Sequence, residues 1–274
     1  MKLFHYTTID TLAHIMNNRC LKFNRLDQLD DITESEPFAA YNPLQYIFSC
    51  SFTYDSVENI PLWRMYANME TGIRLEFDSN KLFELKPVPF KMPSHSHESC
   101  EFPLFLYTAI KSEDILNDDY ALMYWDITEE DSLCSCIKLK KIKYIDDFKE
   151  KYKSLLEIND VKKSDGSISR SLTYKPTDFG FYKSRYWEFQ KEIRCLIYAA
   201  PFPKNQKEMS DIASGKRELR TKQILVPVSD YTLDNIKITL APKVTEASRL
   251  IVESLTKELQ NASIQNSSLR GKIR

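Results

Sequence analysis

The order of apolar and polar residues predicts a strand–helix–strand unit at the start of the chain. After a short apolar run, apolar residues recur at helical spacing over 9–16, so one face of this helix is expected to be buried. Thr7 stands three residues before Asp10, the pattern of a helix N-cap with an acidic partner. Asn17-Asn18 is expected to end the helix, and residues 21–23 begin a new extended run.

Further along, the pattern predicts many short strands and few helices. The predicted strands are 45–52, 73–77, 83–90, 138–145, 193–198, 223–228 and 235–240. A short helix is expected at 61–67, where Pro61 suits the first turn. The last predicted helix carries its apolar side chains at Val244, Ala247, Ile251, Leu255 and Leu259. This order, without regular alternation of strands and helices, is typical of an α+β fold.

Three polar or irregular regions shape the predicted domain organisation. We expect one domain over 1–274, with insertions near 92–135 and 159–171. The second of these regions is the best candidate for a loop, because it is polar and contains a glycine. Residues 206–222 are rich in charge and are expected to be exposed, with a short helix among them.

The composition excludes two common nucleotide-binding architectures. The chain has 274 residues, 42% of them hydrophobic and 28% charged, which is ordinary for a globular protein. It contains five glycines and neither a GxGxxG nor a GxxxxGK[ST] string. Because both motifs need glycine where the backbone approaches a phosphate, Rossmann and P-loop chemistry is not expected.

Charge and hydropathy indicate a cytoplasmic protein. The formal net charge of −1 gives no overall basic field and disfavours a long nucleic-acid target. No stretch reaches the roughly 18 apolar residues of a membrane span, so no membrane partner is expected. The six cysteines are scattered, as is usual for reduced thiols in the cytosol.

A metal site is not expected from the spacing of histidines and cysteines. His95, His97 and Cys100 lie close together in the sequence, and Cys134 and Cys136 are separated by one residue. Neither group has the two-residue gap of the usual Cys-x-x-Cys zinc knuckle. A metal-dependent hydrolase built on these residues is the most distant alternative function.

Four short motifs occur in a fixed order along the chain. They are His5-Tyr6-Thr7; Phe23-Asn24-Arg25-Leu26-Asp27 with Asp30 and Asp31; Trp63-x-x-Tyr66 with Gly72; and Trp187 followed by Glu192-x-Arg194. Together they resemble an uncharacterised bacterial family in the ADP-ribosyltransferase-like clan, over about Leu3 to Leu269. The resemblance implies two antiparallel sheets around a cleft, with peripheral helices. It also implies NAD as a substrate.

The clan's chemistry makes clear why one carboxylate matters most. When the bond between ribose and nicotinamide breaks, nicotinamide leaves as a neutral molecule, so neither an acid nor a metal is needed. Positive charge builds on the ribose, and a nearby carboxylate stabilises it. Similar proteins look like toxins or anti-phage defence effectors, so the acceptor of ADP-ribose would be a protein or a nucleic acid.

The resemblance assigns roles to individual residues. Glu192 would be the catalytic carboxylate, and His5 would contact the ribose of NAD. The backbone of Tyr6 would bind the carboxamide, and Thr7 would support the turn or the ribose. Tyr66 would stack on the nicotinamide. Tyr6 stands where the clan commonly has glycine, which narrows the pocket.

Each of these assignments competes with a structural interpretation. His5 is also suited to a structural role beside a helix start, and Glu192 with Arg194 to an exposed ion pair. Arg25 suits the NAD pyrophosphate, but it also suits its own loop, which contains Asp27, Asp30 and Asp31. Trp63 and Trp187 are expected in the core.

The identity of the carboxylate leaves the activity open. Glu188 lies four residues before Glu192 and could replace it in the reaction. Gln223, which begins another predicted strand, could occupy the equivalent position, and the site would then be inactive. The alternative function is therefore a nucleotide-binding or sensing module of the same fold that has lost transfer.

Overall fold

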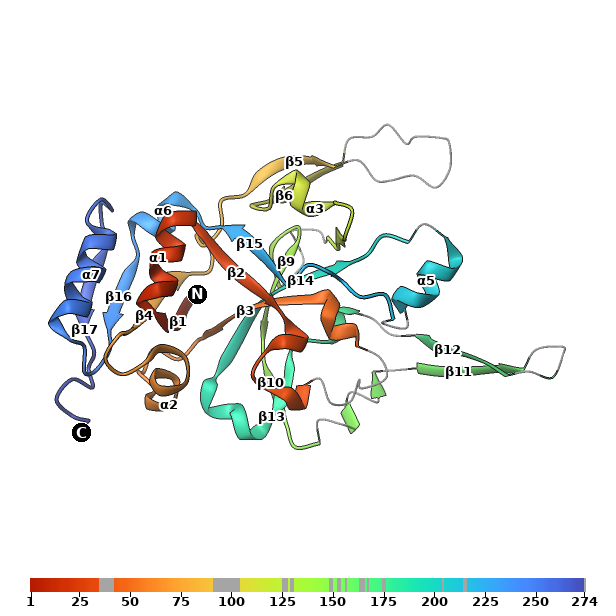
Figure 1. The fold of residues 1–274 in the computed structure, drawn as a ribbon, viewed down its shortest axis with the longest axis horizontal. Coiled ribbons are helices and arrows are strands. Elements are labelled where there is room, and N and C mark those ends of the chain that lie inside the picture. Colours follow the sequence, from red (N-terminus) through yellow and green to blue (C-terminus); the bar gives the residue numbers. More distant parts are fainter. Residues whose placement is uncertain are drawn as a thin grey trace.

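The computed structural model describes residues 1–34, 42–90, 104–124, 128, 131–147, 150–151, 154–155, 157–162, 166, 168–173, 176–203, 205–213 and 216–273. They form an α+β fold built on an 11-stranded sheet (Figure 1). Its strands are β1 (Lys2–Thr8), β2 (Cys20–Arg25), β3 (Ile47–Thr53), β4 (Gly72–Asp78), β7 (Ala121–Leu122), β8 (Ser132–Cys134), β9 (Ile137–Lys141), β14 (Glu192–Ala200), β15 (Gln223–Pro227), β16 (Lys237–Leu240) and β17 (Ser263–Asn266).

Short helices and three small two-stranded sheets surround the main sheet. The α-helices are α1 (Ile9–Asn18), α2 (Ile60–Leu62), α3 (Ser112–Ile115), α5 (Gln206–Ala213), α6 (Asp230–Asp234) and α7 (Glu246–Thr256). The other helical turns are η1 (Leu26–Gln28), η2 (Ile32–Glu34), η4 (Pro43–Tyr46), η5 (Trp63–Ala67), η6 (Pro176–Asp178) and η7 (Arg185–Gln190). The small sheets pair β5 (Lys86–Phe90) with β6 (Leu104–Thr108), β10 (Lys143–Ile145) with β13 (Tyr182–Ser184), and β11 (Glu157–Lys162) with β12 (Ile168–Thr173).

The main sheet branches at one edge of β3. The strands follow the order β17-β16-β4-β1-β3-β14-β9-β8, and β2 pairs with β3 and carries β15. β1 meets β3 at Phe4–Thr53, whereas β2 meets it at Asn24–Ser49. Two strands therefore share one edge of β3, and α1 joins their diverging ends. The two sheets expected from the family resemblance are, in the described residues, two arms of one branched sheet.

The first helix begins one residue later than the sequence predicts. Thr8, not Thr7, is the N-cap of α1: its backbone is extended (φ −94°, ψ 163°), and its side chain accepts a 3.2 Å hydrogen bond from the Thr11 backbone N–H. Thr7 is still part of β1, where it pairs with Ile73. The helix ends at Arg19, whose φ of 54° lies in the left-handed region.

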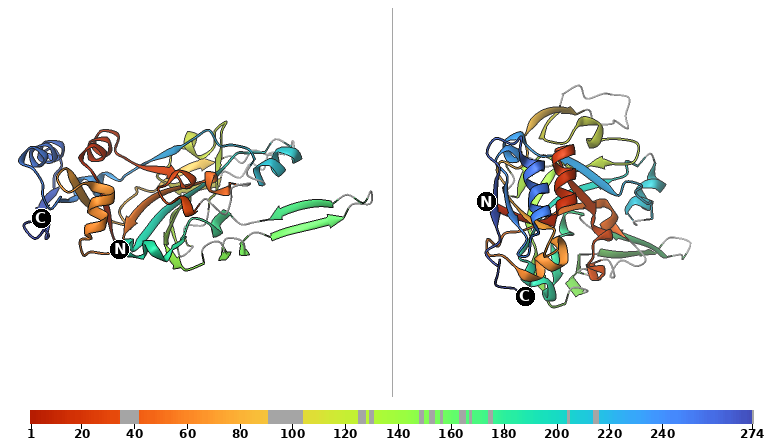
Figure 2. Two further views of the ribbon diagram at one scale, coloured as in Figure 1. Left: turned by 60° about the horizontal axis from the view of Figure 1, so that its bottom comes forward. Right: turned by 60° about the vertical axis from the view of Figure 1, so that its left-hand side comes forward.

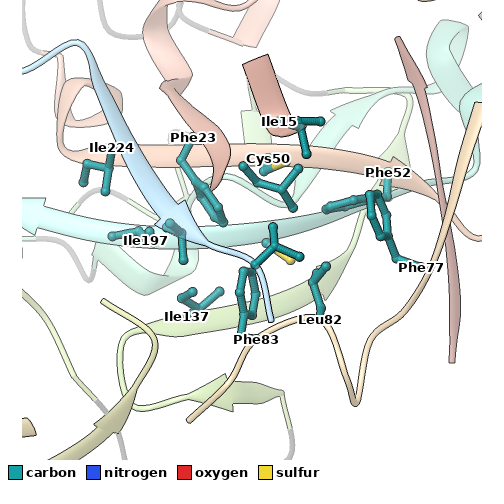
Figure 3. Packing of buried hydrophobic residues seen from close by; sticks show 14 of the residues in the cluster. Ile15, Phe23, Cys50, Phe52, Phe77, Leu82, Phe83, Ile137, Ile197 and Ile224 are labelled. Atoms are coloured by element: carbon teal, nitrogen blue, oxygen red, sulfur yellow. The ribbon is translucent and has the colours of Figure 1, made fainter. Parts of the chain in front are cut away.

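A single large apolar cluster lies between α1 and the strands (Figure 3). It includes Ile15 of α1, Phe23 of β2, Phe52 of β3 and Ile197 of β14, all buried. In β2, burial alternates so that Leu21 and Phe23 enter this core. The intervening residues of β2 consequently lie on the opposite face of the strand.

The pattern-based strand predictions are confirmed in most places and shifted in others. Residues 73–77 and 193–198 fall in β4 and β14, and the predicted strand 223–228 is β15 except for its last residue. The predicted strand 138–145 is divided into β9 and β10 at Ile142, whose N–H donates to the carbonyl of Glu192.

The buried face of the last helix agrees with the prediction only in part: Val244, Leu255 and Leu259 pack against the core, whereas Ala247 is exposed. In α7 the buried residues are Ser248, Val252 and Thr256, whereas Ile251 is 49% exposed. This helix packs beside α1 (Figure 2).

The predicted insertions have different outcomes. The two ends of the predicted insertion 159–171 lie in β11 and β12, an antiparallel strand pair that extends away from the main sheet (Figures 1 and 2). Most of the polar stretch between these strands, 163–165 and 167, lies outside the described residues. The described part of 92–135 contains β6, α3, β7 and β8. No helix among the described residues is long and apolar enough to cross a bilayer.

Candidate functional site

A cavity of about 720 Å³ lies where β1 and β2 separate from β3. Its volume is within the range of about 300–1,000 Å³ that is typical of small-molecule sites. The lining includes five of the six residues that the sequence singles out: His5, Tyr6, Thr7, Tyr66 and Glu192. The branch in the sheet thus brings together residues that are nearly 190 positions apart.

Glu192 is a buried, ionised carboxylate at the start of β14. Its side chain accepts hydrogen bonds from Arg194 Nε at 2.6 Å and from Lys183 Nζ at 3.2 Å. Burial by itself raises the pKa of Glu192, but the positive charges of Arg194 and Lys183 outweigh it and lower the pKa to about 2. The backbone N–H of Glu192 donates to the Tyr144 hydroxyl, which fixes the strand at this point.

Arg194 holds two carboxylates at once. Glu192 and Arg194 are two positions apart in β14, so their side chains point to the same face of the strand. The terminal nitrogens of Arg194 bind both oxygens of Glu34, at 2.9 and 2.7 Å, and Arg194 Nη1 also donates to the carbonyl of Gly180. Arg194 does pair with Glu192, but it is completely buried, so the expectation that this ion pair is exposed is wrong. No motif in the sequence points to Glu34, which is one acid among several in its segment.

A chain of hydrogen bonds connects this cluster to Tyr66. Lys183 Nζ donates to Gln190 Oε1 at 2.9 Å, and Gln190 Nε2 donates to the Tyr66 hydroxyl at 2.7 Å. Burial raises the pKa of Tyr66 to about 12, and the negative charges of Glu192 and Asp30 contribute to the rise. Tyr66 is therefore a neutral phenol whose orientation is fixed at its hydroxyl.

Trp187 belongs to the cavity rather than to the core. It is only partly buried, lines the cavity and lies under the Lys183 ammonium, 4.6 Å from the centre of the ring. The expectation that Trp187 lies in the core is wrong, because η7 runs along the cavity wall. Trp63, in contrast, is completely buried, as predicted.

His5 is held in one tautomer by the neighbouring strand. Its Nδ1 lies 2.8 Å from the carbonyl oxygen of Ser51. Because a carbonyl only accepts hydrogen bonds, Nδ1 carries the proton, and the neutral ring keeps Nε2 as an acceptor. Burial lowers the pKa of His5, which favours this neutral form, although the hydrogen bond to Ser51 acts in the opposite direction.

Tyr6 and Thr7 contribute to the wall of the cavity in β1. The Tyr6 ring packs edge-on against Trp63, with 5.0 Å between ring centres, and its hydroxyl accepts from the backbone N–H of Asn59. The side chain of Tyr6 is therefore committed to a second apolar cluster with Trp63 and Ala67. Thr7 is buried beside it.

The structure does not bring Arg25 to the cavity. Arg25 Nε and Nη2 bind the two oxygens of Asp27 at 2.9 and 2.6 Å, and Nη1 donates to the carbonyl of Leu219. Arg25 is buried and is absent from the cavity lining. This geometry corresponds to the loop-organising role, and it does not fit a contact with the NAD pyrophosphate.

The two alternatives to Glu192 also have definite positions. Glu188 is exposed, lies 3.7 Å from Arg185 and is outside the lining. Gln223 does line the cavity, but on β15, where it pairs with Asn24. Within the described part of the chain, Glu192 is the one glutamate of the lining.

The residues considered for a metal site do not form one where the structure describes them. Among the described residues, no group of three or more histidine, cysteine, aspartate or glutamate side chains could hold a metal ion. His95, His97 and Cys100 lie outside the described residues. Cys134 and Cys136 are buried, and burial raises the pKa of both thiols, that of Cys136 to about 12.

Comparison with known proteins gives one similarity. No curated protein and no solved structure matches the chain. Residues 62–195, just under half of the chain, match a family described as a protein of unknown function (DUF2971). This segment contains Tyr66, Lys183, Glu192 and Arg194.

Proposed function

We propose that this chain is an ADP-ribosyltransferase-like enzyme that binds NAD in the cavity between β1 and β2. The observation that carries the proposal is the position of Glu192. It is an ionised carboxylate in the lining of a cavity that is also lined by His5 and Tyr66. A buried carboxylate, an aromatic ring and a hydrogen-bond acceptor are the groups that the family resemblance implies for cleavage of NAD.

The charges around Tyr66 suit the nicotinamide end of NAD. The nicotinamide ring is cationic and aromatic, so a neutral aromatic ring near negative charge favours it. The carboxylates of Glu192 and Asp30 both act on the Tyr66 hydroxyl. We place the nicotinamide against Tyr66, and His5 Nε2 then accepts a hydrogen bond from a ribose hydroxyl.

In the proposed reaction, the bond between ribose C1′ and the nicotinamide nitrogen breaks. Its electron pair goes to the nicotinamide, which leaves neutral, and the ribose becomes positively charged. The Glu192 carboxylate stabilises this charge until a nucleophile of the acceptor attacks C1′. Arg194 and Lys183 hold the carboxylate in place, so little reorganisation is needed as the charge develops.

The acceptor in this proposal is a protein or a nucleic acid, and the biological setting is that of a toxin or an anti-phage defence effector. Both follow from the family resemblance.

A binding or sensing module is the second candidate, and one observation favours it. Glu192 accepts hydrogen bonds from both Arg194 and Lys183, and these cations offset part of the charge that catalysis would use. If the positive charges dominate, the cavity would bind NAD without cleaving it.

Labelled NAD separates the two functions. The purified chain is incubated with NAD labelled in the adenylate part, and nicotinamide release and label transfer are followed. We expect release by the unchanged chain, a loss of about 100-fold or more in Glu192→Gln, and a smaller loss in His5→Ala.

Glu188→Gln is the matched control, because Glu188 is an exposed carboxylate four residues away and lies outside the lining. It should keep full activity. Turnover that persists in Glu192→Gln would overturn the role of Glu192. Binding of NAD without any turnover would favour the sensing module.

A further inference from the structure

The part of the cavity formed by β2 and β15 has a floor of polar side chains around the apolar Leu225. β2 and β15 pair so that Lys22 faces Leu225 and Asn24 faces Gln223. Burial alternates in both strands, and the apolar residues between these positions enter the core. Lys22, Asn24 and Gln223 therefore share the other face of the ladder, and all three line the cavity.

Helix α1 contributes a second polar wall to the same end. Thr11, His14 and Asn18 also line the cavity. They are three, then four, residues apart and so lie on one side of the helix. The site is thus formed by a helix and a strand pair, elements that do not need a ligand to take their shape.

The charge at this end is positive and not already neutralised. Lys22 is exposed to the cavity and has no ion-pair or hydrogen-bond partner among the residues that the structure describes. The acids in the lining are Asp30, Asp31 and Glu192, which follow β2 or begin β14. None of them comes from α1, β15 or the Cys20–Asn24 part of β2.

The opposite end has the reverse character. There the cations Lys183 and Arg194 already bind Glu192, and Arg194 also binds Glu34. Both cations at that end are therefore already paired with carboxylates, and neither is free to pair with an anionic group of a ligand. The cavity therefore offers an anionic group an unpaired cation at Lys22, whereas the cations near Glu192 are already paired.

The register gives the distance from Glu192 to Gln223, the residue of this floor that is most remote from Glu192 in the strand pairing. Gln223 of β15 pairs with Asn24 of β2, and Asn24 pairs with Ser49 of β3. Four residues further along β3, Thr53 pairs with Glu192 of β14, so the path crosses three pairs of neighbouring strands. At strand spacings of about 4.8 Å and a rise of about 3.4 Å per residue, the two Cα atoms are roughly 20 Å apart. A single nicotinamide is too short to cover this distance, whereas an extended dinucleotide reaches across it.

We propose that α1, β2 and β15 form a phosphate-binding subsite for the diphosphate of a nucleotide. Lys22 supplies the positive charge, and His14, Asn18, Asn24 and Gln223 supply hydrogen bonds. The identity of the rest of the ligand rests on the proposed function, but binding of the diphosphate does not require transfer. The subsite takes the role that the sequence suggested for Arg25.

The test measures binding of two fragments by calorimetry, with ADP-ribose as the diphosphate probe and nicotinamide as the probe for the other end. Lys22→Gln should lower the affinity for ADP-ribose about tenfold or more, since a hydrogen bond to a charged group is lost. It should change nicotinamide affinity less than twofold. ADP-ribose affinity should also fall with added salt, less steeply in Lys22→Gln.

Lys222→Gln is the matched control. Lys222 is exposed and lies next to Gln223, but it is outside the cavity lining. It should leave both affinities unchanged. Because Lys22 is exposed, its variant should fold normally, which thermal unfolding would check.

Three results would overturn the subsite: no binding of ADP-ribose by the unchanged chain, equal affinity in Lys22→Gln, or equal weakening in Lys222→Gln. Failure of the proposed function would look different. Nicotinamide release from NAD would then be absent, while ADP-ribose binding would still depend on Lys22.

Discussion

Arg194 Nε donates a 2.6 Å hydrogen bond to Glu192 Oε1, while the other end of the same guanidinium binds both oxygens of Glu34. With Lys183, these residues form a buried cluster of two cations and two carboxylates. Two charges of each sign balance within the cluster. The net energy of such a cluster is modest, but removal of one member leaves a buried charge without its partner.

Replacement of Arg194 should therefore destabilise the fold strongly. In Arg194→Met, Lys183 alone would face two buried carboxylates, and we expect a loss of about 3–5 kcal/mol in the free energy of unfolding. Urea denaturation measures this loss. Arg185→Met is the control, because the Arg185–Asp146 pair is exposed and should contribute little. Equal effects of the two substitutions would contradict the buried cluster.

His5 should make stability depend on pH. Burial lowers the pKa of His5 in the folded chain below its usual value of 6.5. As the pH falls below 6.5, the unfolded chain takes up a proton that the folded chain does not, so the contribution of His5 is complete above pH 6.5 and is lost on acidification. Urea denaturation at pH 7.5 and 5.5 should show a smaller loss of stability in His5→Gln than in the unchanged chain.

His14→Gln serves as the control for this measurement. His14 is exposed on α1. In His14→Gln, the free energy of unfolding should therefore change between pH 7.5 and 5.5 by as much as it does in the unchanged chain. An equal reduction in the His5 and His14 variants would mean that burial of His5 is not the source of the pH dependence.

Tyr66 offers a test of stacking against hydrogen bonding. Tyr66→Phe removes the hydroxyl that accepts from Gln190 but keeps the ring. If the ring stacks on the nicotinamide, Tyr66→Phe should keep nicotinamide affinity within about threefold, whereas Tyr66→Ala should lose about tenfold. Calorimetry with nicotinamide distinguishes them. Equal losses in both variants would show that the hydroxyl, not the ring, matters.

The sequence could predict those elements whose burial follows from local alternation. β4 and β14 appear where apolar residues alternate or run together, because each strand packs against the core along its whole length. In α7, Ser248 and Val252 are buried and Ile251 is exposed, and the helix lies in contact with α1. That contact joins residues far apart in the chain, so no local pattern contains it.

The site shows the same division. Motifs pointed to His5, Tyr66 and Glu192, and the structure places all three around one cavity. The partners of Glu192 could not be predicted, since Glu34 reaches Arg194 across 160 positions. The branch at β3 depends on two strands sharing one edge, which only pairing in three dimensions decides.

Arg25 is the residue for which the structure changes the expected result of mutation. Its three donor nitrogens bind Asp27 and the carbonyl of Leu219, outside the cavity. Arg25→Gln should therefore leave the Asp27 carboxylate with the hydrogen bond from Asn42 but without its ion-pair partner, and lower the free energy of unfolding by about 3 kcal/mol. At a temperature where the variant remains folded, ADP-ribose affinity should stay within about twofold, because no group that contacts the ligand is lost. Urea denaturation and calorimetry on the same preparation check both parts. A loss of ADP-ribose affinity like that expected for Lys22→Gln, with unchanged stability, would place Arg25 in the phosphate site after all.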